Sequence, residues 1–220
     1  MTSALEATDL FRFFHAGEEE TVALRGVSMA VVAGEMVAVT GPSGSGKSTL
    51  LACLAGLDEP DGGMVRVAGH NVSRRPETER AQLRARHIGM LFQSANLLDH
   101  LTVDQNVALA QRLGRGVDRA RGASLLSDLG LTPRAHAYLS QLSGGETARA
   151  GLAVAIANAP DVLLADEPTG ELDAEAERNV LDLMRGHADN GGAVVVVTHS
   201  LRVAAAADRT IALRDGEVDA

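Results

Sequence analysis

The chain has 220 residues, 45% of them hydrophobic, and a formal net charge of −9, so it is long enough for a large core, as one domain or as a core with a lobe. The net negative charge and the lack of a stripe of basic residues argue against nucleic acid as a partner. No apolar run approaches the roughly 20 residues that span a bilayer, and the single cysteine, Cys53, excludes an internal disulfide and is expected in the core.

The first third of the chain predicts mainly β-structure. Residues 4–14, 22–31 and 64–68 are short stretches with alternating or β-branched residues, and glycine-containing turns separate them. Residues 36–40 (MVAVT) predict a short buried strand, and residues 48–57 (STLLACLAGL) predict a helix after it.

The remaining chain predicts helices first and then an alternation of strands and helices. Residues from about 102 to 129 have arginine-rich polar faces typical of helices, and residues 146 to about 158 predict a further helix. Apolar strands that alternate with helices imply a parallel sheet. We expect strands at 161–165, 193–198 and 210–214, and helices at 174–188 and 200–207.

The only lysine, Lys47, lies in residues 41–48 (GPSGSGKS), here called the P-loop. This segment matches G-x-x-x-x-G-K-[ST], in which backbone N–H groups hold phosphates, a compact ammonium reaches the β- and γ-phosphates, and a hydroxyl binds Mg²⁺. A chance glycine-rich turn is the alternative, but the strand before and the helix after are the context that the motif requires. The sequence thus predicts a nucleoside triphosphate site with Mg²⁺, whose contacts are Gly41, Pro42, Ser43, Gly44, Ser45, Gly46, Lys47, Ser48 and Thr49.

Two acids, Asp166 and Glu167, end the apolar stretch that begins at Val162. A carboxylate at the end of such a strand can reach the Mg²⁺ held by Ser48. The next residue, Glu167, can polarise the attacking water as a general base, a role worth about 10²- to 10⁴-fold in rate. An ordinary acidic turn at a strand end is the alternative.

A second anion-binding pattern lies at Ser143, Gly144 and Gly145, just before a predicted helix. Backbone N–H groups, a hydroxyl and the helix dipole would converge there. A simple N-cap by Ser143 is the alternative. Two phosphate-binding segments in one chain indicate that two copies face each other and complete each other's sites.

Together these motifs resemble the nucleotide-binding subunit of ATP-binding cassette (ABC) transporters, over essentially all 220 residues. Residues 41–49 match the Walker A motif, 142–146 the signature motif and 162–166 the Walker B motif. The resemblance implies ATP and Mg²⁺ as ligands, with Lys47, Glu167 and His199 as catalytic residues. It also assigns Ser48, Gln93 and Asp166 to the metal, Gln93 to the Q-loop, Asp173 to the D-loop at the nucleotide and His199 to the switch histidine.

The resemblance implies an α/β fold of the P-loop NTPase type, with a RecA-like core, an N-terminal antiparallel β lobe and an inserted α-helical subdomain. A single ABC domain would cover residues 1–220. Its expected parts are a β lobe at about 1–35 and 64–72, a core at about 36–63, 73–93 and 156–220, and a helical subdomain at about 94–155.

Two of the assigned residues also follow predicted strands. Residues 194–197 would deliver His199 to the carboxyl edge of the sheet, where ligands bind in open α/β folds. There an imidazole can hydrogen-bond the γ-phosphate, although a histidine in a loop often has no such role. Gln93 follows a strand at 88–91 and opens onto the helical insertion, where an amide can bind Mg²⁺ and release it after hydrolysis.

Further segments, such as 34–39 (GEMVAV) and 164–170 (LADEPTG), are similar to the MacB/LolD/FtsE-type ATPases. Those ATPases partner FtsX-like permeases in export, lipoprotein release or cell-division signalling. The resemblance implies an ATP-dependent homodimer, bound peripherally to the cytoplasmic side of the plasma membrane through an FtsX/MacB-like permease. The ATPase of an ABC importer and a non-transport ABC ATPase remain alternatives. A GTPase motif of the N-K-x-D type is impossible because Lys47 is the only lysine.

Three positions depart from the family pattern. Glu146 replaces the usual glutamine of the signature motif, and Val154 stands where an arginine is common. Phe14, 33 residues before Lys47, stands where a tyrosine usually meets the adenine. We expect the Phe14 ring to stack on the base, although Phe11, Phe13 and Phe14 could all belong to the core of the β lobe.

A permease would need a docking surface on this chain. We expect a groove between the Gln93 loop and the helices that begin near Val103, lined by Leu97, Leu98 and Leu101. The alternative is that these leucines pack the helical insertion itself.

Overall fold

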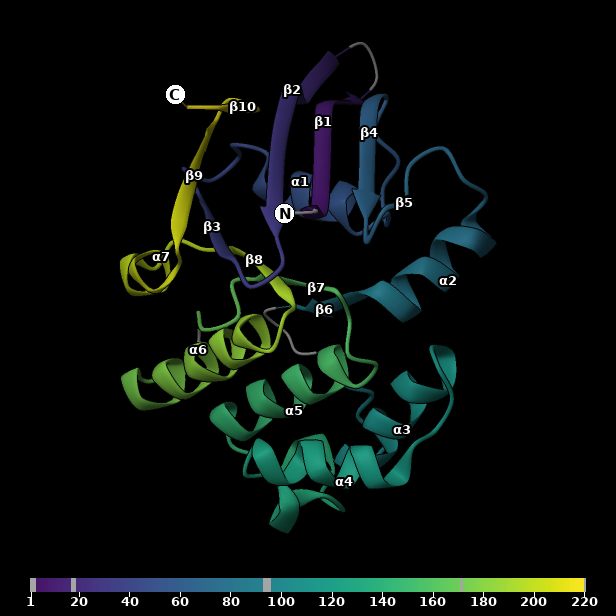
Figure 1. The fold of residues 1–220 in the computed structure, drawn as a ribbon. Helices are drawn as coiled ribbons and strands as arrows, with labels where there is room; N and C mark the ends of the chain where they lie inside the picture. The colour runs from purple at the N-terminus through teal and green to yellow at the C-terminus, as the bar shows by residue number, and fades with distance from the viewer. Residues whose placement is uncertain (1–2, 17–18, 93–95, 171, 220) are drawn as a thin grey trace.

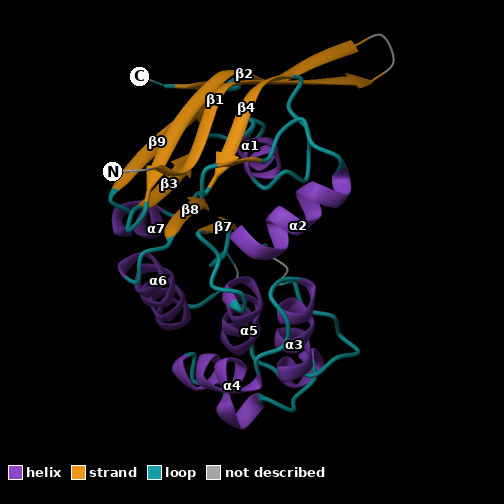
Figure 2. Cartoon of the chain, turned by 45° about the vertical axis from the view of Figure 1, so that its right-hand side comes forward, coloured by secondary structure: helices purple, strands orange, loops and turns teal. Residues whose placement is uncertain are grey.

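The computed structural model describes residues 3–16, 19–92, 96–170 and 172–219. Figures 1 and 2 show a β-rich upper part and a helical lower part. In the described chain the strands form a four-stranded antiparallel sheet and a six-stranded, mainly parallel sheet. The predicted α/β class, with an antiparallel lobe beside a parallel core, is therefore confirmed.

The antiparallel sheet is the predicted β lobe, and its strand order is β2-β1-β4-β5. The stretches with alternating apolar and polar residues form strands here, as predicted. The pairing of β1 with β2 contains several register shifts. The strands are β1 (Ser3–Ala16), β2 (Glu19–Val32), β4 (Gly62–Val67) and β5 (His70–Asn71).

The second sheet has the order β10-β9-β3-β8-β7-β6, and all its neighbours are parallel except β10 and β9. The short closing strand β10 was not predicted. The strands are β3 (Met36–Thr40), β6 (Ile88–Leu91), β7 (Val162–Asp166), β8 (Ala193–Val197), β9 (Arg209–Arg214) and β10 (Glu217–Val218).

The central parallel strands β3, β7 and β8 are buried on both faces, which explains why they read as continuous apolar runs. Side chains alternate between the two faces: Val37 and Val39 join one hydrophobic cluster, and Met36 and Ala38 join the other. The first cluster also contains the β lobe and α1 (Lys47–Leu54). The second contains residues of α5 (Gly144–Ile156), α6 (Ala174–Asp189) and α7 (Leu201–Ala206).

The predicted helical middle forms α3 (Val103–Leu113), α4 (Arg119–Asp128) and two short 3-10 helices, η1 (Thr132–Arg134) and η2 (Leu139–Gln141). These helices lie beside α5 at the lower end of the molecule (Figure 1). Among the described helices, none combines the length and apolar character needed to cross a bilayer.

Helix α1 is shorter than the predicted 48–57. It ends at Leu54 because Gly56 adopts a left-handed φ of +64°. The Leu57 N–H then donates to the Ala52 carbonyl at 2.9 Å, as in a Schellman motif. Cys53 is buried in this helix, as predicted, and burial raises the pKa of its thiol to about 12.

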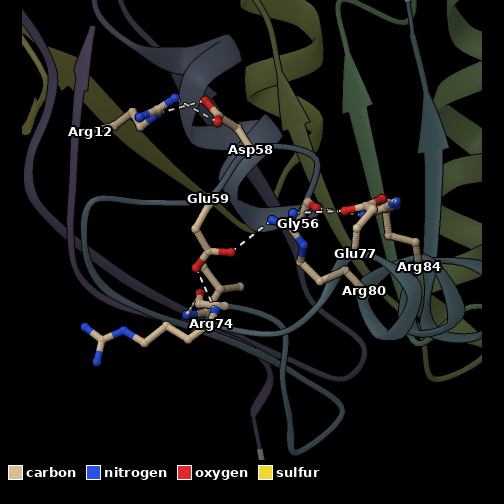
Figure 3. A network of polar contacts seen from close by, with 10 residues as sticks. Arg12, Gly56, Asp58, Glu59, Arg74, Glu77, Arg80 and Arg84 are labelled. Atoms are coloured by element: carbon tan, nitrogen blue, oxygen red, sulfur yellow. Dashed lines mark hydrogen bonds and ion pairs between the residues drawn. The ribbon is translucent and has the colours of Figure 1, made fainter.

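Helix α2 (Glu77–His87) was not predicted, and none of its residues is buried. An ion pair and a hydrogen bond attach it to the segment that follows α1 instead (Figure 3). Arg80 donates to Glu59 at 2.9 Å, and Arg84 donates to the Gly56 carbonyl at 2.7 Å. Its sequence signal was electrostatic: acids occupy the first turn and basic residues the last, which complements the helix dipole.

Candidate functional site

The P-loop, the acid pair Asp166 and Glu167, and His199 lie together at the carboxyl edge of three neighbouring parallel strands, β3, β8 and β7. Val197 of β8 pairs with Val39 on one side and with Asp166 on the other. The P-loop, His199 and the acid pair therefore leave the sheet at the same level. They surround a cavity of about 640 Å³, here called the P-loop cavity. Of the predicted residues, its lining includes Phe14, Ser43, Gly44, Gly46, Lys47, Ser48, Thr49, Asp166, Glu167 and His199.

Lys47 holds the P-loop in shape from within. Its side-chain nitrogen donates to the carbonyl oxygens of Gly41 at 3.0 Å and Pro42 at 2.9 Å, and the residue is only 7% exposed. Gly46 has a φ of +100°, and a Cβ there would collide with the carbonyl oxygen of Ala23 in β2. The loop therefore requires glycine at this position for both conformation and space.

Three residues of the predicted phosphate-binding set lie outside the lining of the P-loop cavity. Gly41 and Pro42 face Lys47 with their carbonyl oxygens. The Ser45 hydroxyl is buried and has no hydrogen-bond partner among the described residues. These three residues shape the loop, whereas Gly44, Gly46 and Ser48 face the cavity.

Ser48 and Asp166 form a pair of oxygen donors at the cavity. Both residues line the cavity, and the Ser48 hydroxyl favours the ionised form of the Asp166 carboxyl group, which by itself lowers its pKa. Burial, followed by the negative charge of Glu167, raises the pKa of Asp166 above its usual value. A hydroxyl and a carboxylate are the ligand types that Mg²⁺ prefers, so these residues fit a magnesium ion, and a cation would relieve the cost of the buried charge.

Glu167 adopts a left-handed φ of +46°, and its N–H donates to the Val197 carbonyl at 3.0 Å. Its Oε2 accepts from the His199 N–H at 3.2 Å and from the Thr198 hydroxyl at 3.4 Å. Its Oε1 lies 3.6 Å from His199 Nε2, and it is buried without a hydrogen-bond partner among the described residues. This backbone outlier places an unused acceptor at the cavity, as strained residues at active sites often do.

Ser143, Gly144 and Gly145 line a second cavity of about 450 Å³, here called the signature pocket. Helix α5 begins at Gly144, two residues earlier than predicted, so both glycines lie in its first turn. The Ser143 hydroxyl accepts from the Glu146 N–H at 3.3 Å, and Glu146 Oε2 accepts from the Ser143 N–H at 2.8 Å. The unusual Glu146 thus completes a capping box.

A neighbouring arginine balances the charge of Glu146. Arg134 of η1 donates to Glu146 Oε1 at 2.8 Å, and this bond lowers the pKa of that carboxyl group. The acid therefore stays ionised but paired, beside a helix N-terminus that favours anions.

Asp173 lies in the signature pocket, among the residues around Ser143. Its carboxylate caps α6 by accepting the N–H groups of Glu175 at 3.0 Å and Ala176 at 2.8 Å. The structure thus brings Asp173 together with the signature motif and not with the P-loop cavity. The predicted Gln93 lies outside the described residues.

The three phenylalanines of β1 divide between two faces, as strand alternation predicts. Phe11 and Phe13 stack with ring centroids 6.4 Å apart. Phe14 is 41% exposed and lines the P-loop cavity. Its strand partner Thr21, with Val22 and Ala23, also lines this cavity. These β2 residues were not predicted, because no sequence signal fixes the pairing register that brings them there.

The three leucines predicted to line a groove have different environments. Leu97 packs against the second hydrophobic cluster, which matches the alternative reading, whereas Leu98 is 43% exposed and Leu101 is half-buried. A cavity of about 450 Å³ lies nearby between α2, β6, α3 and α5, and none of the three leucines is among the residues that line it. We call this cavity the subdomain groove. Its apolar lining includes Leu57, Met90, Phe92, Leu113 and the family-departing Val154.

The comparisons with known proteins agree on one family. The family model described as ABC transporter matches residues 24–170. The macrolide export ATP-binding/permease protein MacB of Shigella flexneri and that of Escherichia coli (strain K12) are each 45% identical to the chain over 221 residues. These matches cover 99% of this chain and 34% of each relative, so the chain spans about a third of the length of the curated relatives it matches.

Solved structures give the same result. The ATP-binding cassette MJ0796, in a dimeric post-hydrolysis state bound to ADP and Pi, matches with a TM-score of 0.90 and 35% identity. The match covers 98% of this chain and 97% of that one. A nucleotide-free ATP-binding cassette from an ABC transporter matches with a TM-score of 0.85 at 20% identity, which supports the fold alone.

Proposed function

This chain belongs to the ABC transporter family as an ATP-binding cassette, and we propose that it hydrolyses ATP to drive a membrane permease. The family resemblance of its motifs is confirmed. One observation carries the proposal: Lys47, Ser48, Asp166, Glu167 and His199 converge on one cavity at the carboxyl edge of the sheet. Phosphate release from ATP by the purified chain, measured with and without Mg²⁺, tests it.

Each of these side chains has a distinct task in the proposed reaction. The ammonium of Lys47 and the N–H groups at the start of α1 would hold the triphosphate. Ser48 and Asp166 would hold Mg²⁺, which supplies positive charge to the phosphate oxygens when bound. The free Oε1 of Glu167 would accept a proton from the attacking water. His199 lies within reach to orient that carboxylate and to contact the γ-phosphate.

We further propose that ATP closes two copies into a homodimer. Within one chain, the P-loop cavity and the signature pocket are separate and share no lining residue. Each is suited to phosphate, and only the P-loop cavity contains the catalytic glutamate. One ATP would therefore lie between residues 41–48 of one copy and 143–145 of the other. The MJ0796 cassette, which is dimeric with ADP and Pi, supports this arrangement.

Phe14 is proposed as the stacking platform for the base, which gives a testable effect on affinity. Phe14→Ala should weaken ATP binding by about 1–3 kcal/mol, since stacking on an aromatic ring is worth that amount per base. GTP should bind within about tenfold of ATP and lose a similar amount, because every base has a π-face. Titration calorimetry with both nucleotides measures this. Unchanged affinity in the variant would return Phe14 to a purely structural role.

The permease partner is proposed to be of the FtsX/MacB type, either as a separate subunit or as part of the same chain. The likeness to MacB proteins, which are named as ATP-binding/permease proteins, supports this. The ATPase would then sit on the cytoplasmic side of the plasma membrane through that permease. The subdomain groove is the proposed docking surface, because its lining is mainly apolar and combines residues of α2, β6, α3 and α5.

The docking proposal predicts that polar substitutions in the subdomain groove separate binding from catalysis. Leu113→Asn, at a residue that is 70% exposed, should reduce co-purification with the permease by at least several-fold and spare basal ATP hydrolysis. Val117→Asn, on an exposed residue outside the groove, is the matched control. Full permease recovery with Leu113→Asn would exclude this docking surface.

A further inference from the structure

Arg12 of β1 lies against the aromatic ring of Phe14. Its guanidinium carbon is 4.6 Å from the ring centroid, within the range of a cation–π contact. Of these two residues, Phe14 lines the P-loop cavity and Arg12 does not. The guanidinium therefore lies over the ring outside the cavity. The exposed part of the Phe14 ring faces the cavity.

Two aspartates after α1 fix the guanidinium in place. Its Nε and Nη2 donate to the two oxygens of Asp58 at 2.8 and 2.9 Å, and its Nη1 donates to Asp61 at 2.9 Å (the Asp58 pair is drawn in Figure 3). A bidentate bond of this kind fixes the plane of the guanidinium as well as its position. The Arg12 side chain is only 20% exposed, and these bonds raise its pKa, chiefly through Asp58.

This network links the ring to the helix that carries the phosphate-binding residues. Asp58 lies four residues after the last residue of α1, and Lys47 and Ser48 lie at the first turn of the same helix. Phe14 has no polar atom that could hold its own ring in one orientation. The Arg12–Asp58 pair can therefore hold the Phe14 ring at a fixed position and orientation relative to the P-loop.

The charge of Arg12 also changes what the ring can stack on. Both faces of an aromatic ring are electron-rich, so face-to-face contact with another π-system is opposed electrostatically. A cation on one face offsets part of this negative potential. A base stacked on the cavity side would meet less repulsion than on an isolated phenylalanine.

We propose that Arg12, held by Asp58 and Asp61, is a positioning residue for the nucleotide base: it orients Phe14 and strengthens stacking on the cavity side of the ring. This inference rests on the proposed nucleotide-binding function. It concerns the base alone, because the side-chain contacts of Arg12 among the described residues are with Phe14, the Phe13 backbone and two aspartates, and none is with a P-loop residue.

The test compares ATP with inorganic tripolyphosphate, which lacks the base, both with Mg²⁺. Arg12→Met removes the charge and the donors but keeps an unbranched apolar side chain. It should weaken ATP binding about 3- to 30-fold, which is part of what stacking of one base on an aromatic ring contributes, because the Arg12–Phe14 contact itself is present with and without ATP. Tripolyphosphate binding should change by less than about twofold. In a Phe14→Ala background, Arg12→Met should have no further effect on ATP affinity.

Arg12→Lys is the second variant, in case the methionine variant does not fold. It keeps an ion pair with the aspartates, but an ammonium cannot form the same bidentate bond, so ATP affinity should fall while tripolyphosphate affinity does not. Arg66→Met, at an exposed arginine of β4, is the matched control. Equal losses for ATP and tripolyphosphate, no loss for ATP, or an undiminished loss in the Phe14→Ala background would overturn the inference. A wild-type chain that binds neither ligand would instead contradict the proposed function.

Discussion

Glu167→Gln should slow ATP hydrolysis by about 10²- to 10⁴-fold while leaving ATP binding intact. Glutamine has the same size, and its amide oxygen can still accept from the His199 N–H and the Thr198 hydroxyl, so the local backbone should keep its conformation. An amide cannot take the proton of the attacking water at neutral pH. The variant should therefore bind ATP and Mg²⁺, fail to turn over and accumulate as an ATP-bound dimer.

Steady-state phosphate release and size-exclusion chromatography with saturating ATP and Mg²⁺ measure both parts of this prediction. Glu217→Gln, an identical substitution at an exposed residue of β10, is the control and should behave as wild type. Hydrolysis at the wild-type rate by Glu167→Gln would remove Glu167 as the general base. A variant that stays monomeric with ATP would count against nucleotide-dependent dimerisation.

Substitution of Lys47 should weaken ATP binding severely. We expect an affinity loss of about 100-fold or more for both Lys47→Ala and Lys47→Arg. The alanine variant loses the ammonium that bonds the Gly41 and Pro42 carbonyls and that would meet the phosphates. The arginine variant keeps the charge, but its broad planar group does not fit a site where Lys47 is only 7% exposed. Geometry should therefore matter as much as charge.

Titration calorimetry with ATP and Mg²⁺ gives the affinities, and thermal unfolding without nucleotide shows whether each variant is folded. The matched control is Arg66→Lys, the reverse exchange at an exposed position. If Lys47→Arg bound ATP as tightly as the wild type, the compact-ammonium argument would be wrong.

The gathering of the candidate site residues at the carboxyl edge of the sheet was predictable because each of them has a local signal. Lys47 stands in a motif with a fixed loop conformation, and Asp166 and His199 directly follow apolar runs that could only be buried strands. Parallel strands end at the same edge, so these residues had to meet. The separate location of the signature pocket also followed, because Ser143 begins a helix and not a strand end.

Features that depend on tertiary contacts were not predictable. Helix α2 has no buried residue and hence no apolar period, and its attachment through Arg80 and Arg84 depends on where Glu59 and Gly56 lie. The pairing of Phe14 with Thr21 depends on register shifts between β1 and β2. The contacts of Arg12 had no local sequence signal, because the aspartates that hold it are more than 45 positions away.

The central claim is that each ATP site is shared between two copies, and native mass spectrometry of a mixed dimer tests it most directly. One chain would carry Lys47→Ala and the other Gly144→Asp, both in the Glu167→Gln background. A Cβ at Gly144 meets only Leu172, at 3.9 Å, and an acid is tolerated in the first turn of a helix, so this change should add a negative charge to the signature pocket without disturbing α5.

Neither homodimer has an intact shared site, whereas the heterodimer has one, formed by the P-loop of the Gly144→Asp copy and the signature motif of the Lys47→Ala copy. With ATP and Mg²⁺, the heterodimer should therefore be strongly enriched over both homodimers and should carry a single ATP. If each site belonged to one chain, the heterodimer would show no such enrichment, and a statistical mixture of dimers or monomers alone would contradict the shared-site account.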